Sequence, residues 1–239
     1  MRTYKYRDGR NIGLGAVFLF ALGISAWNYS HAAQQGADLI RLGMGSIIVV
    51  EGDSLTYGYD ASLSGITNSI NGSTQPRSRS PYPETLGSLV SACASVVNHG
   101  FPGDRSVDGL VRWQDSTPSD VAILMYGTND ALNFGQSPTG RVNLETFRAV
   151  LSLLVTRRRN QGAKSIIMAP PPIKNSVSDK LLAPFRASAQ QVAVREGVKF
   201  IDTTALLTGV VEPWTDGVHL SALANLRIAE SLAAIVSCR

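Results

Sequence analysis

Short apolar runs rich in β-branched residues alternate along the chain with longer amphipathic segments. Such a run is typical of a buried strand, whereas apolar residues that recur every three or four positions are typical of a helix. The predicted strands are Ser46–Val50, Ser95–Asn98, Val121–Tyr126, Ser165–Ala169 and Lys199–Asp202. The predicted helices are Tyr82–Ala92, Ser106–Trp113, Asn143–Asn160, Lys180–Glu196 and Ser221–Val236. This alternation predicts an α/β fold in which helices cover both faces of a five-stranded parallel sheet.

The segment Asn143–Asn160 ends in three consecutive arginines, Arg157–Arg159. They fall at the predicted C-terminus of the helix, where positive side chains interact favourably with the helix dipole. We therefore interpret the basic run as a helix end and not as a nucleic-acid-binding patch.

The first 32 residues differ from the rest of the chain. A basic start over Met1–Arg10 precedes an apolar run over Ile12–Trp27, and Ser30-His31-Ala32 has small residues at the two positions that signal peptidase reads. We predict a signal peptide over residues 1–32. The alternative is an uncleaved membrane anchor, because the apolar run is only slightly shorter than the roughly 20 residues that span a bilayer. Both alternatives predict a secreted or periplasmic protein that contacts a membrane only through this segment, if it is retained.

The remaining residues, 33–239, are long enough for one α/β domain with its own core. The net charge of the whole chain is +4, but residues 1–32 carry +3 of it, and the remainder has 18 basic and 17 acidic residues. A nearly neutral domain predicts no nucleic-acid partner.

The two cysteines, Cys93 and Cys238, have two interpretations. In an oxidising compartment they could form a disulfide that ties the C-terminal helix to the body of the domain. They could equally be two separate buried thiols, since the sequence gives no distance between them.

Polar motifs follow the predicted strands where the strands end. The first strand stops at Gly52-Asp53-Ser54, the second is followed by Asn98–Ser106 and the third by Tyr126–Asp130. A fourth motif, Asp216-Gly217-Val218-His219, precedes the last helix. Open parallel sheets bind ligands at the carboxyl ends of their strands, so we expect the motifs to meet there. Taken alone, Ser54 could be a helix N-cap and Asn129 a turn residue, but four motifs in this order indicate a common site.

In their order and spacing, the four motifs resemble those of the SGNH (GDSL) hydrolase superfamily, and the resemblance covers nearly all of residues 33–239. It implies a flavodoxin-like three-layer α/β/α fold and hydrolysis of esters or thioesters through a covalent acyl-serine. It also implies that Ser54 is the nucleophile, that His219 is the base and that Asp216 orients His219. The oxyanion hole that the resemblance implies consists of Ser54, Gly103 and Asn129.

The chemistry of these residue types agrees with those roles. A serine hydroxyl is a poor nucleophile until a base takes its proton, and histidine can do so near neutral pH. A nearby carboxylate can hold the other ring nitrogen and fix the tautomer. Backbone N–H groups and an asparagine amide can stabilise the oxyanion of a tetrahedral intermediate. Because Gly103 has no Cβ, its backbone can approach that oxygen closely.

Other features lead to weaker expectations. The segment Ala61–Ser80 is rich in Ser, Asn, Gly and Thr, and it is either a substrate-facing flap or a surface loop without a role. We expect His99 to support the site or lie on the surface, and Asp53 and Asp130 to make structural hydrogen bonds. The sequence contains no Gly-x-Ser-x-Gly motif and no cluster of metal ligands, so we expect neither an α/β-hydrolase elbow nor a cofactor.

The function that we expect from the sequence is an extracytoplasmic serine esterase that removes small acyl groups such as acetate from carbohydrate. Its partner would be a small-molecule or saccharide ester. The alternatives are an acyltransferase that passes the acyl group to a saccharide, a lipase or thioesterase for longer chains, and a non-catalytic carbohydrate-binding module. A binding module would have no need for the nucleophile, base, carboxylate and amide together. A nucleotide-binding domain is disfavoured, because Asp53 stands where a phosphate would bind.

Overall fold

The computed structural model describes residues 39–63 and 68–238. The signal peptide or anchor predicted over residues 1–32 lies outside this part of the chain. In the residues that are described, no helix is both long enough and apolar enough to cross a membrane.

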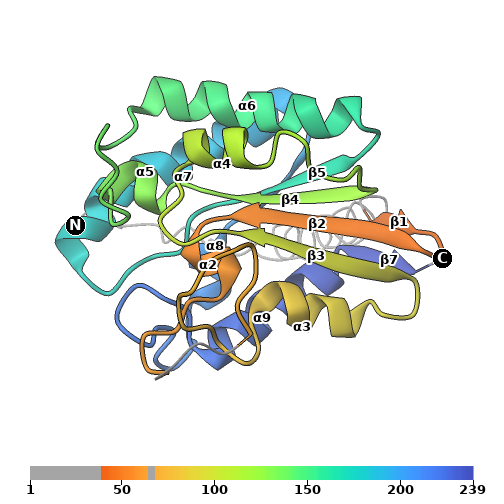
Figure 1. The fold of residues 1–239 in the computed structure, drawn as a ribbon, viewed down its shortest axis with the longest axis horizontal. Helices are drawn as coiled ribbons and strands as arrows, with labels where there is room; N and C mark the ends of the chain where they lie inside the picture. Colours follow the sequence, from red (N-terminus) through yellow and green to blue (C-terminus); the bar gives the residue numbers. More distant parts are fainter. Residues whose placement is uncertain (1–38, 64–67, 239) are drawn as a thin grey trace, which may run out of the picture. The chain divides into compact units, whose positions relative to one another are not determined.

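Five parallel strands form the central sheet, in the order β3-β2-β4-β5-β6 (Figure 1). The bounds of the strands are β2 Ser46–Gly52, β3 Ala94–Gly100, β4 Val121–Met125, β5 Lys164–Met168 and β6 Lys199–Ile201. Every neighbouring pair in this sheet is parallel. Counted from β2, the order is that of flavodoxin-like sheets, in which the order of strands reverses beside the first strand. The sequence-based prediction of a five-stranded parallel sheet is confirmed.

The central strands are buried on both faces, as expected when helices cover a parallel sheet. In β4, for example, all five residues are buried. Ile123 and Met125 face one hydrophobic core, and Leu124 between them faces the other. Because successive strand residues point to opposite faces, a continuous apolar run serves both cores.

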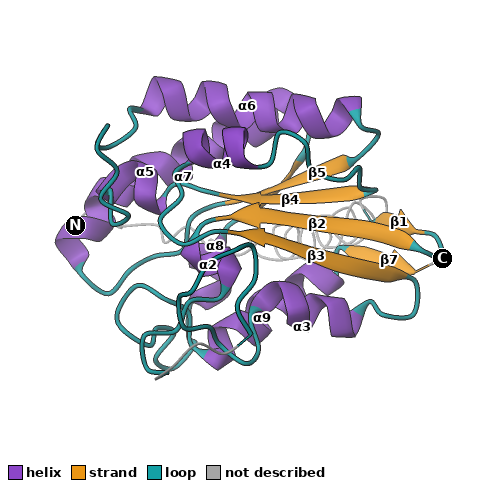
Figure 2. Ribbon diagram, viewed as in Figure 1, coloured by secondary structure: helices purple, strands orange, loops and turns teal. Residues whose placement is uncertain are grey.

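Helices cover each face of the sheet (Figure 2). One face carries α4 (Ser106–Arg112), α6 (Leu144–Asn160) and α7 (Ser176–Glu196), and the other carries α3 (Tyr82–Leu89), α8 (Thr203–Leu207) and α9 (Ala222–Ala233). The predicted three-layer arrangement is therefore confirmed. Three short helices were not predicted: α8, and two that follow strands, α2 (Ser54–Tyr57) and α5 (Thr128–Leu132).

Three helix ends differ from the prediction by three residues or more, and the first is the end of α3 at Leu89 and not at Ala92. Helix α7 begins at Ser176 and not at Lys180, because Asn175 caps it by accepting hydrogen bonds from the backbone N–H groups of Val177 and Ser178. The last helix ends at Ala233, before the predicted end at Val236.

The residues after the last helix form a strand instead. Strand β7 (Val236–Cys238) pairs in parallel with β1 (Ile40–Leu42) in a separate two-stranded sheet. Cys238 in β7 forms a disulfide with Cys93, with their Cα atoms 5.6 Å apart. This resolves the open question of the two cysteines. A disulfide stabilises a fold chiefly by restricting the unfolded chain, more so for residues far apart in sequence, and these are 145 positions apart.

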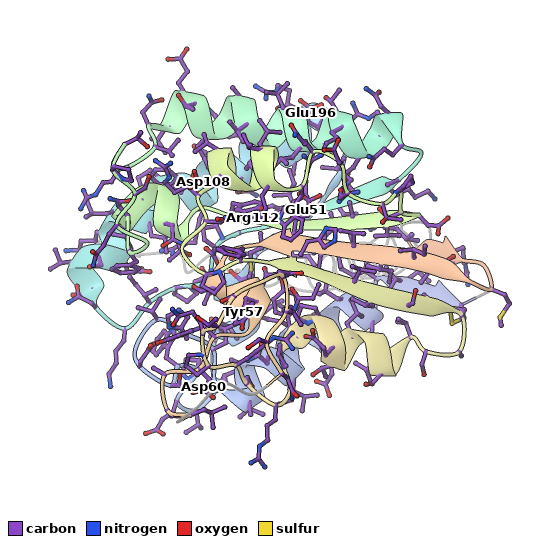
Figure 3. All side chains as sticks on the ribbon, viewed as in Figure 1. Glu51, Tyr57, Asp60, Asp108, Arg112 and Glu196 are labelled. Carbon is purple, nitrogen blue, oxygen red and sulfur yellow. A yellow bond between two sulfur atoms is a disulfide. The ribbon has the colours of Figure 1, made fainter. Side chains whose placement is uncertain are left out.

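The arginine run at the end of α6 has a role that the sequence did not indicate. Glu51, on β2 and labelled in Figure 3, is fully buried, and its carboxylate binds Arg157 at 2.7 Å and Arg158 at 2.6 Å. Arg158 is also fully buried. A buried charge is tolerated only when it is paired, so this cluster ties the end of α6 to β2. The interpretation of the run as a helix C-terminus is confirmed.

Candidate active site

Ser54 follows the carboxyl end of β2 and is the first residue of the one-turn helix α2. The tight passage from strand to helix depends on Gly52, because a Cβ there would lie 2.1 Å from Thr56 Oγ1. Gly58 ends the helix after one turn with φ of +86°, in the left-handed region that glycine adopts without strain. The backbone thus fixes Ser54 at the edge of the sheet.

The N-cap of α2 is Asp53, whose side chain accepts a 2.9 Å hydrogen bond from the backbone N–H of Leu55. The alternative explanation of Ser54 as an N-cap is therefore wrong. The Ser54 hydroxyl faces a different partner, the imidazole of His219.

A chain of hydrogen bonds joins Ser54 to the loop before α9. His219 Nε2 lies 2.9 Å from Ser54 Oγ, and His219 Nδ1 lies 2.7 Å from Asp216 Oδ2. Ser54 and His219 are 165 positions apart in the sequence, and the structure brings them into one continuous line with Asp216.

Asp216 is hydrogen-bonded to the backbone of its own loop as well as to the imidazole of His219. Its Oδ1 accepts hydrogen bonds from the backbone N–H groups of Val218 at 2.9 Å and His219 at 2.8 Å. Partial burial would raise the pKa of Asp216, but the hydrogen bonds from His219 and Val218 outweigh burial and hold the pKa below its ordinary value. Asp216 is therefore ionised at neutral pH. An ionised partner favours the tautomer in which Nδ1 carries the proton and Nε2 can accept one from Ser54.

Gly103 lies in the loop between β3 and α4 with φ of +85°, a conformation that favours glycine. The residue after it, Asp104, accepts hydrogen bonds of 2.7 and 2.8 Å from the Arg112 guanidinium. The same guanidinium lies 3.5 Å from the ring centroid of Phe101, on the other side of Gly103. Arg112, labelled in Figure 3, thus holds both flanks of the loop from α4.

Asn129 lies in α5, immediately beyond β4. Its Nδ2 donates a 3.1 Å hydrogen bond to the carbonyl oxygen of Asp104 and so contacts the Gly103 loop. An amide nitrogen carries two N–H groups, so this bond leaves a second donor. The alternative explanation of Asn129 as a turn residue is wrong, because Asn129 belongs to a short helix.

All five sequence-predicted site residues line one hollow of about 390 Å³, which we call the Ser54 hollow. Its remaining lining residues were not predicted as site residues and are Tyr59, Gln75, Pro102, Phe134 and Gly135. The ring of Tyr59 packs on the imidazole of His219, with the ring centroids 4.4 Å apart.

Comparison with known proteins identifies the family of the chain. The model of the GDSL-like lipase/acylhydrolase family matches residues 50–225, which include Ser54, Asn129 and His219. The chain belongs to this family. Membership of the GDSL-like family makes it a carboxylic ester hydrolase, as the sequence predicted. No curated protein matches the chain significantly.

Several solved structures share the fold. A lipase/acylhydrolase from Enterococcus faecalis is 22% identical with a TM-score of 0.61, and the match covers 79% of this chain and 95% of that one. LAE5, an α/β hydrolase from the metagenome of Lake Arreo, is 21% identical with a TM-score of 0.63 and coverages of 80% and 96%. Axe2, an acetylxylan esterase from Geobacillus stearothermophilus, is 21% identical with a TM-score of 0.62 and coverages of 80% and 94%. At such identities, the likeness establishes the GDSL-like fold.

Two buried carboxylates, Asp53 and Asp130, are the sequence neighbours of the site residues Ser54 and Asn129. Asp130 accepts hydrogen bonds from the backbone N–H and the hydroxyl of Ser106, and Asp53 caps α2. The expectation that both make structural hydrogen bonds is confirmed. Burial raises the pKa of Asp130 to about 6, although the bonds from Ser106 lower it. Burial, together with the nearby charge of Asp130, likewise raises the pKa of Asp53 to about 7, against the effect of the Leu55 N–H.

Replacing Asp53 with asparagine is expected to flatten the dependence of stability on pH. The pKa of Asp53 is about 7 in the folded chain, whereas an unperturbed aspartate has a pKa of 3.8, so the folded state holds this proton over the interval between them. Stability from this group is therefore full below pH 4 and falls as pH rises toward 7. The loss is roughly 4 kcal/mol once the carboxylate is fully ionised. Asparagine still caps α2 but has no proton to lose.

The measurement is the urea midpoint of the wild type and of Asp53→Asn at a series of pH values between 4 and 8. We expect the variant to gain stability relative to the wild type as pH rises. A constant difference across this range would show that Asp53 is ionised throughout and would contradict its raised pKa.

His99 lies outside the Ser54 hollow. Its ring stacks on Trp113, with the ring centroids 4.2 Å apart and the planes within 5°. Burial, together with the charges of Arg158 and Arg157, lowers the pKa of His99 to about 4. A neutral, stacked ring agrees with the expectation of a supporting role. In the described part of the chain, no group of three or more His, Cys, Asp or Glu residues could hold a metal ion.

The segment Ala61–Ser80 contributes Gln75 to the hollow, so that part of it faces the site. Residues 64–67 lie outside the described residues. The carbonyl oxygen of Gln75 accepts a 2.9 Å hydrogen bond from the hydroxyl of Tyr57 in α2, which fixes Gln75 near Ser54. No sequence motif marks Gln75, Tyr59 or Phe134, because their places depend on how loops return to the sheet edge.

Proposed function

We propose that the chain is an extracytoplasmic serine esterase that removes small acyl groups, acetyl above all, from carbohydrate. The observation that carries this proposal is the line of hydrogen bonds from Asp216 through His219 to Ser54, in the lining of the Ser54 hollow. An imidazole between a carboxylate and a serine hydroxyl is the arrangement of acyl-transfer enzymes.

In the first half of the reaction, Ser54 Oγ attacks the ester carbonyl carbon as its proton passes to His219 Nε2. The tetrahedral intermediate collapses, the bond to the alcohol oxygen breaks, and His219 returns the proton to the leaving alcohol. In the second half, a water molecule loses a proton to the same nitrogen and attacks the acyl-Ser54 carbonyl. Collapse then releases the carboxylic acid and restores the Ser54 hydroxyl. No cofactor takes part in this proposal.

The oxyanion of each tetrahedral intermediate would accept hydrogen bonds from the backbone N–H groups of Ser54 and Gly103 and from Asn129 Nδ2. Asp104 supports this role, because its carbonyl binds one N–H of the Asn129 amide and so fixes the amide plane. Donors held in place before the reaction stabilise the transition state without a cost of reorganisation.

The dimensions of the Ser54 hollow support a small acyl group. Its volume of about 390 Å³ is near the lower end of small-molecule pockets. Its apolar lining comes from Tyr59, Pro102 and Phe134, a small surface for a long acyl chain. The exposed ring of Phe134 and the half-buried ring of Tyr59, beside polar groups, suit the faces of sugars, and Gln75 adds an amide at the same place. The name of the similar Axe2, an acetylxylan esterase, agrees with an acetylated saccharide.

The extracytoplasmic location rests on two features. The N-terminal residues have the basic and apolar pattern of a signal peptide or an anchor. The disulfide between Cys93 and Cys238 is a type of bond that persists in oxidising compartments and is rare in the cytosol.

The test of the substrate is hydrolysis of p-nitrophenyl acetate and p-nitrophenyl octanoate by the purified chain. The test of the location is the same assay on the extracytoplasmic and cytosolic fractions of the producing cells. We expect kcat/KM for the acetate ester to exceed that for the octanoate ester by at least about tenfold, because a pocket discriminates by the methylene groups it can hold. We also expect acetate release from acetylated xylooligosaccharides. The activity should be found outside the cytoplasm.

A preference for octanoate would overturn the small-acyl proposal in favour of a lipase or thioesterase. Transfer of acetyl to an added saccharide faster than to water would favour the acyltransferase. Activity confined to the cytosol would contradict the proposed location.

A further inference from the structure

Two glycines from different loops meet in the lining of the Ser54 hollow. Gly103 precedes α4, and Gly135 follows α5. A Cβ on Gly135 would lie 2.4 Å from the carbonyl oxygen of Gly103, 2.7 Å from its Cα and 3.0 Å from its carbonyl carbon. All three are backbone atoms, so no side-chain rotation could make room. The two backbones are therefore packed directly against each other.

The loop that carries Gly135 is closed by its own hydrogen bonds. Asn133 Oδ1 accepts a 3.0 Å hydrogen bond from the backbone N–H of Ser137, and Asn133 Nδ2 donates to the carbonyl oxygen of Ser137 at 3.2 Å. Gln136 N–H also donates to the carbonyl oxygen of Asn133, at 2.9 Å. The turn over residues 133–137 therefore holds Gly135 in a fixed place; we call it the Gly135 turn.

The Gly135 turn is continuous with the helix that carries Asn129. Asn133 is the C-cap of α5, and its backbone N–H donates a 2.8 Å hydrogen bond to the carbonyl oxygen of Asn129. One end of the Gly135 turn is thus hydrogen-bonded to Asn129, and Gly135 in its middle packs against Gly103. Gly103 and Asn129 are the two residues that, together with Ser54, would supply the donors to the oxyanion.

We propose that Gly135 is a positioning residue that sets the Gly103 peptide at the correct distance from Asn129 for both to bind the oxyanion. This inference rests on the proposed function, because it assumes that Gly103 and Asn129 stabilise a tetrahedral intermediate. Glycine is required for close approach and not for its backbone conformation, since its φ lies outside the left-handed region. A methyl group at this position would displace the Gly103 peptide.

The variant Gly135→Ala is expected to lower kcat for p-nitrophenyl acetate by about 10- to 100-fold. This is less than the loss of a whole donor, because the N–H is displaced and not removed. KM should change by less than about twofold, because the oxyanion exists only in the transition state. Phenylboronic acid, which forms a tetrahedral adduct with an active serine, should bind more weakly by a similar factor to the fall in kcat. A merely structural role would not produce this split between kcat and KM.

Two further variants complete the design. Gly43→Ala makes the same chemical change where no atom lies within 4 Å of the added Cβ and φ is ordinary, and it should leave all three quantities unchanged. Asn133→Gly keeps the left-handed backbone of Asn133 (φ of +52°) but removes both side-chain bonds to Ser137, and it should lower kcat more mildly than Gly135→Ala.

Unchanged kcat in a folded Gly135→Ala protein would overturn the proposal. If that variant does not fold, Asn133→Gly decides the question: a lower kcat at unchanged KM supports the proposal, and an unchanged kcat overturns it. A failure of the serine esterase mechanism itself is recognised separately, because Ser54→Ala would then retain activity.

Discussion

Replacing Ser54 with alanine is expected to lower kcat for p-nitrophenyl acetate by about 10⁶-fold, the size of the loss when the serine is removed from a protease triad. The variant keeps the GDSL-like fold, because the Ser54 hydroxyl bonds to His219 Nε2, whereas Asp53 holds the helix that contains it. Without Oγ, no acyl-enzyme can form. Water would have to attack the ester directly, with only the oxyanion donors to assist.

The comparison is between the wild type and Ser54→Ala at matched concentration, with circular dichroism and Tm as checks on folding. Ser62→Ala is a suitable control, since Ser62 is an exposed serine that bonds to Asp60. We expect Ser62→Ala to retain the wild-type rate. If Ser54→Ala were folded and as active as this control, Ser54 could not be the nucleophile.

Replacing Asp216 with asparagine is expected to lower kcat by about 10⁴-fold while leaving the loop intact, by analogy with the same change in a serine-protease triad. Asparagine can still accept the two backbone bonds from Val218 and His219 through Oδ1. Its NH₂ group, however, would face His219 Nδ1, where Asp216 Oδ2 now lies at 2.7 Å. A donor there favours the tautomer that carries its proton on Nε2, and that nitrogen cannot accept a proton from Ser54.

The matched variant is Asp216→Ala, which also removes the bonds to the backbone of the loop. We expect Asp216→Asn to keep a Tm near that of the wild type, and we expect Asp216→Ala to be inactive and to have a lower Tm. NMR of the imidazole nitrogens in Asp216→Asn reports the tautomer directly. An active Asp216→Asn with its Nδ1 still protonated would show that the orienting carboxylate is not needed.

The sequence predicted those features that depend on local pattern and chain order. Each strand of the central sheet appears as a short β-branched run, and parallel pairing places the motifs after β2, β3 and β4 at one edge. Ser54, Gly103 and Asn129 could therefore be predicted to meet without coordinates. The start of α7 was missed because its signal is one capping asparagine before a segment of weak amphipathicity.

Features that arise from packing between distant segments could not be predicted in this way. The burial of Arg158 against Glu51 joins α6 to β2 and has no counterpart in the spacing of either residue. The contact between Gly103 and Gly135 likewise depends on two loops that meet only in three dimensions. A glycine in a loop sequence indicates a turn as readily as a close backbone contact.

The most direct test of the account is to identify the residue labelled by a fluorophosphonate. Such a probe reacts only with an activated serine: Oγ bonds to phosphorus, fluoride leaves, and the hydroxyl proton passes to the base. We predict one label per chain, located on Ser54 by peptide mass spectrometry. In the wild type, esterase activity should be lost in parallel with labelling, and in Asp216→Asn the labelling should be strongly slowed. A fully active wild-type protein that carries no label on Ser54, or inactivation by a label on another residue, would contradict the account.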